Sequence, residues 1–137
     1  MYTLETAPFG FRVTSSGRVT LEEATEQLIE SRVLLRVCPK PFGVLVDIRT
    51  LLPLSEDVQA VVDETQRLFR HSGLERSAVV LASAVVTMQF MRIAKDTGVY
   101  VHERYVDASK QPNWERVALD WIVQGIDPDL GSRRPPR

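Results

Sequence analysis

The fold is decided by the stretch Phe42-Gly-Val-Leu-Val-Asp-Ile48, which is apolar throughout apart from its glycine and its aspartate. Such a run is typical of a strand buried on both faces, and strands of this kind are usually parallel, with helices packed over the sheet. A second run of the same character, Ala-Val-Val-Leu-Ala at 78–82, follows after an amphipathic segment. The two runs therefore predict neighbouring parallel strands at the centre of an α/β sheet.

Amphipathic helices are predicted between and after these strands. The first begins at Thr20, whose hydroxyl and the Glu23 carboxylate form the pattern of a capping box, and it ends before Pro39. We expect further helices from Ser55 to Gly73 and from about residue 84 to residue 97. The clearest helical spacing in the chain belongs to a fourth helix and comprises Trp114, Val117, Ala118, Trp121 and Ile122.

The remaining strands complete a mixed sheet. Alternating residues in 2–7 and 11–14, separated by a turn, predict an N-terminal hairpin, and the alternation in 99–106 predicts a last, more exposed strand near an edge. The expectation is one α/β domain over residues 1–126, with a mainly parallel sheet of about five strands and four helices, mostly on one face. The Pro- and Arg-rich segment 127–137 is expected to be a disordered tail.

Composition excludes several classes of function. The net charge of −1 gives no basic footprint for nucleic acid or for an anionic membrane surface. Cys38 is the single cysteine, so neither an intrachain disulfide nor a cysteine metal cluster can form. No apolar run reaches the ~20 residues that span a bilayer, so no transmembrane segment is expected. No signal peptide is expected either, and together these features favour a cytoplasmic protein.

Three segments resemble a known family. Gly17-Arg-Val-Thr-Leu-Glu-Glu23 is similar to the start of the first helix in SpoIIAA-like domains, and Val44-Leu-Val-Asp47 is similar to their central strand. Tyr105-Val-Asp107, followed by 115–122, resembles their terminal strand and helix, so that the similarity spans about residues 2 to 124. These domains belong to the STAS (sulfate transporter and anti-sigma antagonist) fold and have SEC14-like bacterial relatives.

The resemblance implies a SpoIIAA-like fold and a non-catalytic regulatory or protein-binding role. The SEC14-like kinship implies an alternative, the binding of a small apolar ligand or lipid, and a homodimer is expected because small domains of this kind often pair through an edge strand or a helix face. In the sporulation antagonists a serine in Asp-Ser-Ser-Gly is phosphorylated, whereas this chain has Leu-Ser-Glu-Asp at 54–57. The two acidic residues after Ser55 would repel a phosphate, which argues against such control, although the helix N-terminus would partly offset them.

Polar residues gather where the central strands are expected to end. Asp47, Arg49, Thr50 and Ser55 lie at the carboxyl end of the first apolar strand, which is where open parallel sheets bind ligands. They form either a binding or switch loop, or an ordinary connection in which Asp47 and Arg49 pair and Ser55 caps a helix.

The next apolar strand ends in a similar way. Ser83 and Thr87 follow it and open a helix that could hold an anion, or they simply cap that helix. The third helix carries Met88, Phe90, Met91 and Ile93 on more than one face, which indicates core packing, the lining of an apolar pocket or a dimer face.

No motif for catalysis, a cofactor or a metal occurs. Gly-x-Ser-x-Gly, the P-loop and the Rossmann pattern are all missing, and His71 and His102 have no metal-ligand spacing. We therefore expect no enzyme, no cofactor and no metal site. The least favoured alternative is an enzyme that uses Asp47, Ser55 or His102.

Overall fold

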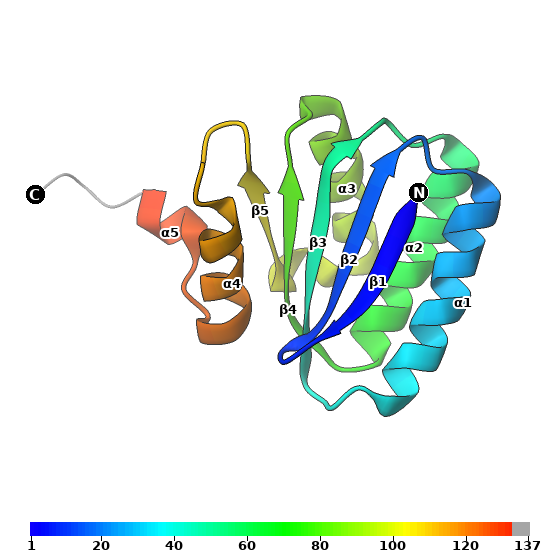
Figure 1. Cartoon of the computed structure of the whole chain (residues 1–137), viewed down its shortest axis with the longest axis horizontal. Helices are drawn as coiled ribbons and strands as arrows, with labels where there is room; N and C mark the ends of the chain where they lie inside the picture. The colour runs from blue at the N-terminus through cyan, green and yellow to red at the C-terminus, as the bar shows by residue number, and fades with distance from the viewer. Residues whose placement is uncertain (133–137) are drawn as a thin grey trace, which may run out of the picture.

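The computed structural model describes residues 1–132 (Figure 1). Its strands and helices follow in the order β1 (Tyr2–Ala7), β2 (Gly10–Gly17), α1 (Leu21–Val37), β3 (Phe42–Leu51), α2 (Glu56–His71), β4 (Leu74–Leu81), α3 (Ala84–Thr97), a 3-10 helix η1 (Val99–His102), β5 (Glu103–Asp107), α4 (Trp114–Gln124) and α5 (Pro128–Ser132). Within the described residues, no helix is long and apolar enough to cross a lipid bilayer.

The five strands form one mixed sheet in the order β1-β2-β3-β4-β5. The β1–β2 hairpin is antiparallel and every other pairing is parallel, as the sequence predicts. Each parallel crossover steps to the next strand in the same direction, and such crossovers are right-handed, so α1, α2 and α3 all lie on one face of the sheet (Figure 1). After β5 the chain returns across the opposite face, where α4 packs on β3, β4 and β5.

Alternation along β3 divides the core into two layers. Val44 and Ile48 pack toward α1, α2 and α3, whereas Leu45 packs with Ala78, Val80 and Trp121 beneath α4. Burial on both faces explains why the run at 42–48 is apolar almost throughout. Asp47 and Arg49 have the same parity as Leu45, so they lie on the α4 face.

Helix boundaries follow local chemistry. The Thr20 hydroxyl accepts a hydrogen bond from the Glu23 amide at 3.1 Å, and the Glu23 carboxylate accepts one from the Thr20 amide at 3.3 Å, so the predicted capping box is present. Helix α3 spans Ala84–Thr97 and ends at Gly98, whose φ of 87° is left-handed. Glycine reaches this conformation without a steric penalty, which explains the sharp end of the helix.

The last strand is shorter than the sequence indicates. We expected a strand over 99–106, but Val99–His102 form η1 and β5 comprises Glu103–Asp107. The reason is tertiary: only Val99 of these four residues is buried, so their alternating pattern does not correspond to a core face and a solvent face.

The expected disordered tail begins with ordered structure. Pro128–Ser132 form α5, so residues 1–132 contain five helices besides η1 where four were expected. Just before α5, the Asp127 carboxylate accepts two hydrogen bonds from the Arg104 guanidinium, each of 3.0 Å. Residues 133–137 lie outside the described part of the chain.

Candidate functional site

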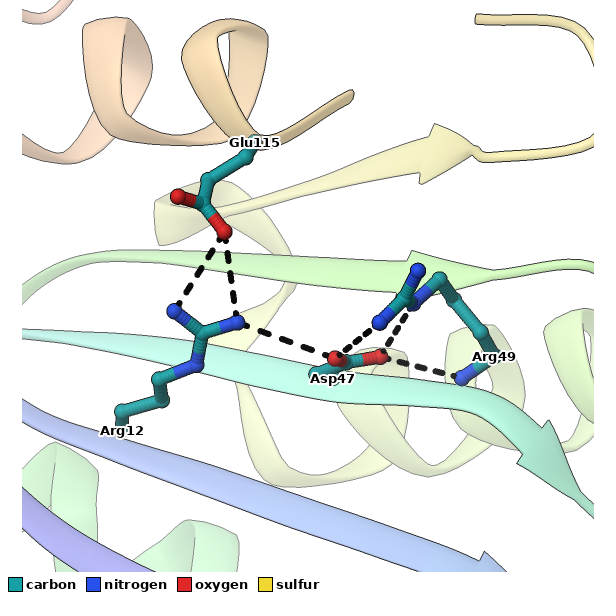
Figure 2. Close-up of polar contacts among 4 residues, drawn as sticks. All are labelled: Arg12, Asp47, Arg49 and Glu115. Atoms are coloured by element: carbon teal, nitrogen blue, oxygen red, sulfur yellow. Dashed lines mark hydrogen bonds and ion pairs between the residues drawn. The ribbon is translucent and has the colours of Figure 1, made fainter. Parts of the chain in front are cut away.

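Asp47 and Arg49 form a bidentate ion pair on the α4 face of the sheet (Figure 2). Arg49 Nε lies 2.9 Å from Asp47 Oδ1, and Arg49 Nη2 lies 3.0 Å from Asp47 Oδ2. The Asp47 side chain is buried, and hydrogen bonding to it raises the pKa of Arg49 above its ordinary value. Residues two apart on a strand share a face, so this contact follows from their spacing.

Two residues at the start of α4 and one on β2 extend this pair into a clamp. Arg12 Nη2 lies 3.8 Å from Asp47 Oδ2 and 3.4 Å from Glu115 Oε2. The Arg49 guanidinium stacks over the Trp114 ring at 4.0 Å from its centroid, a favourable cation–π contact. The two arginines and the two carboxylates balance in charge, so the clamp needs no further charged partner. Its ion pairs hold the N-terminus of α4 to β2 and β3 (Figure 2).

The four candidate hydroxyls do not join this clamp. Within residues 1–132, none of the Thr50, Ser55, Ser83 and Thr87 side chains is hydrogen-bonded to Asp47 or Arg49, and Thr50 is exposed. Ser83 and Thr87 act at the start of α3: the Ser83 hydroxyl accepts from the Val86 amide at 3.3 Å, and the Thr87 hydroxyl donates to the Ser83 carbonyl at 2.8 Å.

Ser55 occupies the N-cap position of α2 but makes no side-chain cap. Its hydroxyl donates to the Asp57 carboxylate, which also accepts from the Val58 amide at 2.9 Å. These hydrogen bonds lower the pKa of Asp57, the bond from Ser55 being the larger cause. The carboxylate, and not the serine, therefore satisfies a free amide at this helix start.

A cavity of about 80 Å³ lies between the sheet and the three helices that cover it. Most of its roof comes from α2, through Val58, Val61, Val62 and Phe69 among others. The floor runs across the sheet from Val13 on β2 to the first residue of β5, and α1, α3 and η1 add one or two residues each. The polar side chains among the lining residues are Ser15, Gln27, Thr65, Gln66, Ser77 and Glu103.

Glu103 is a buried carboxyl group at one end of the cavity floor, with 6% of its surface exposed. The Ser77 hydroxyl donates to Glu103 Oε1 at 3.0 Å, and the Tyr105 hydroxyl donates to Glu103 Oε2 at 2.6 Å. Burial raises the pKa of Glu103 to about 7, although the two hydrogen bonds act in the opposite direction and lower it. Burial also raises the pKa of Tyr105, with the Glu103 charge adding to the effect.

Sequence reasoning missed Glu103 because it placed this residue on an exposed strand. Glu103 and Tyr105 share the face of β5 that α2 and α3 cover, and Ser77 is the register partner of Glu103 on β4. The sequence offers one signal: Glu103 is two residues before the aromatic Tyr105, so the two side chains share a face of the strand. This indicates a core-facing position for Glu103 once the strand is known to begin at residue 103.

The other sequence candidates for chemistry lie apart. Within residues 1–132, no hydrogen bond joins Asp47, Ser55 and His102, and no group of three or more His, Cys, Asp and Glu side chains could hold a metal ion. Cys38 is half-buried at the end of α1, and burial raises the pKa of its thiol. A raised thiol pKa disfavours the nucleophilic thiolate.

No family model matches the chain, and no curated protein matches it. The function proposed below therefore rests on the geometry of the chain itself.

Proposed function

We propose that this chain is a non-catalytic binding domain of the SpoIIAA-like type that holds a small, largely apolar molecule in the cavity beneath α2. The cavity carries this proposal, because its walls are mostly aliphatic and aromatic while a few polar groups converge on it. Pockets of this composition are the usual sites of small ligands. The hairpin at one edge of the sheet and the three helices on one face support the SpoIIAA-like assignment.

The size of the cavity limits its occupant. Its volume of about 80 Å³ is smaller than the ~150 Å³ of an engineered apolar cavity that binds benzene or xenon. A short branched hydrocarbon body smaller than benzene, such as that of isobutane, matches this space. A long acyl chain would require α2 to move away from α1 and α3, the helices that flank it.

Xenon and isobutane are suitable apolar probes of the cavity. We expect either probe to shift the methyl NMR signals of Val61 and Val62, which line the cavity, and to leave those of Val117 on α4 unchanged. A Val62→Phe substitution should fill the cavity and abolish the shift of the Val61 signals, whereas Val123→Phe at an exposed position of α4 should not. Unchanged Val61 and Val62 signals at saturating probe would refute the proposal.

A second candidate is the regulatory, protein-binding role that the family resemblance implies, with a second copy of the chain as the partner. Ile29, Val33 and Val37 are 55%, 58% and 77% exposed, and their spacing of four residues makes an apolar ridge along α1. In an antiparallel two-fold pairing centred on Val33, Glu30 of one copy lies opposite Arg36 of the other. The second copy would thus cover the apolar ridge, and the opposite charges of Glu30 and Arg36 would lie beside it.

Sedimentation at increasing protein concentration tests this second candidate. We expect wild-type protein to form a dimer that Val33→Glu disrupts, because a charge would enter the middle of the buried ridge. Val101→Glu introduces the same charge at another exposed valine, on η1, and should leave the dimer intact. A wild-type monomer at every concentration would exclude pairing through α1.

A further inference from the structure

We infer that Glu103 anchors the ligand of the cavity, and that this ligand carries a basic amine on a small hydrocarbon body. This inference rests on the proposed function, since it assigns the chemistry of a molecule held in the same cavity.

The Glu103 carboxyl group has unused capacity for hydrogen bonds. Each of its oxygens accepts one bond, from Ser77 and from Tyr105, whereas an ionised carboxylate offers about four acceptor sites. Two other polar groups of the lining are already engaged: the Thr65 hydroxyl donates to the Val61 carbonyl, and the Gln66 carbonyl oxygen accepts from Thr97. Glu103 is therefore the strongest acceptor with free sites on the cavity wall.

The cavity provides no positive charge to balance this carboxylate. In the described part of the chain, its lining contains no lysine, arginine or histidine. A buried charge without a partner is costly, and the raised pKa of Glu103 reflects the same desolvation. A ligand ammonium group supplies the missing charge, so that the ligand and Glu103 form a neutral pair inside the protein.

Other head groups should bind the Glu103 carboxylate less well for the same physical reason. An alcohol can donate one hydrogen bond to Glu103 but leaves its negative charge unbalanced. A hydrocarbon gains only from burial of its apolar surface. A carboxylate ligand would place two negative charges side by side and should be rejected.

Four probes that share a small isopropyl body test this ranking: isopropylamine, isopropanol, isobutane and isobutyrate. Each is titrated into the full chain while the methyl signals of Val61 and Val62 are followed. We expect the amine to bind about tenfold or more tightly than the alcohol and the hydrocarbon, and the carboxylate not to bind. Glu103→Gln should remove the advantage of the amine and leave binding of isobutane unchanged.

Glu26→Gln is the matched control, because it removes a carboxylate from the exposed surface of α1 and should preserve the ranking. If isobutane binds and the amine binds no better, the role of Glu103 is overturned while the cavity remains a ligand site. If none of the four probes shifts the valine signals, the proposed function fails and this inference fails with it. If Glu103→Gln does not fold, the ranking of the four probes on the wild-type protein decides alone.

Discussion

Glu103 should make the stability of this protein fall as the pH rises through the weakly acidic range. Its folded-state pKa is about 7, whereas the ordinary value is 4.5. Below about pH 4.5 the carboxyl group is protonated in both the folded and the unfolded chain, so its burial carries no charge penalty. Between these two pKa values the unfolded chain releases the proton and the folded chain retains it, which favours unfolding.

The size of the effect follows from the shift. One pKa unit corresponds to about 1.4 kcal/mol, so a difference of roughly 2.5 units lowers the free energy of unfolding by about 3 kcal/mol between pH 4.5 and pH 7. Above pH 7 Glu103 is ionised in both states, and its contribution becomes constant. A loss of this size is a substantial part of the ~5–15 kcal/mol that stabilises a typical domain.

Urea denaturation of wild-type protein and Glu103→Gln at a series of pH values measures this contribution. Glutamine keeps the shape of the side chain and cannot ionise, so the difference between the two curves isolates Glu103 from the other titrating groups. We expect the difference in the free energy of unfolding to change by about 3 kcal/mol from pH 4.5 to pH 7, because the wild type loses stability relative to the variant over this range. Parallel curves over that range would show that Glu103 is not buried as described.

Three further substitutions test other parts of the structure by urea denaturation. Arg49→Met should cost about 1–2 kcal/mol, because the buried Asp47 carboxylate loses its bidentate partner, though the half-exposed arginine limits the loss; an unchanged stability would contradict the clamp. Ser31→Ala should stabilise by about 1 kcal/mol, since this fully buried hydroxyl has no hydrogen-bond partner in the described chain; a loss would show that the hydroxyl is satisfied. Gly98→Ala should cost at least about 1 kcal/mol, because the backbone is left-handed and the added Cβ would lie 2.7 Å from Arg70 Nη1; a gain would refute that conformation.

Local patterns predicted most of the fold. The runs around Leu45 and Val80 are buried central strands, because burial on both faces leaves a readable apolar signature. Thr20 and Gly98 mark helix ends through chemistry that their near neighbours complete. Helix α5 was missed because the residues before it are held by a contact between distant segments, the ion pair of Arg104 with Asp127.

The sites were less predictable than the fold. The Asp47–Arg49 pair follows from spacing on one strand, but its partners Arg12 and Trp114 depend on strand register and on where α4 crosses the sheet. The position of Glu103 beneath the helices depends on the 3-10 turn before β5, which no pattern in residues 99–102 signals. Contacts of this kind are set by tertiary packing, which a local sequence pattern does not encode.

The uniform stepping of the strands from β1 to β5 has a consequence for where ligands can enter. In many α/β enzymes two neighbouring crossovers leave the sheet toward opposite faces, and the gap between them forms the binding crevice. Here α1, α2 and α3 all leave toward one face, and only the chain after β5 leaves toward the other, so the connections diverge at the β4–β5 end of the sheet and not at its centre. The cavity lies away from that end, beneath the helical layer, and α2, the middle helix of three, is the element whose outward movement would open a passage on either side.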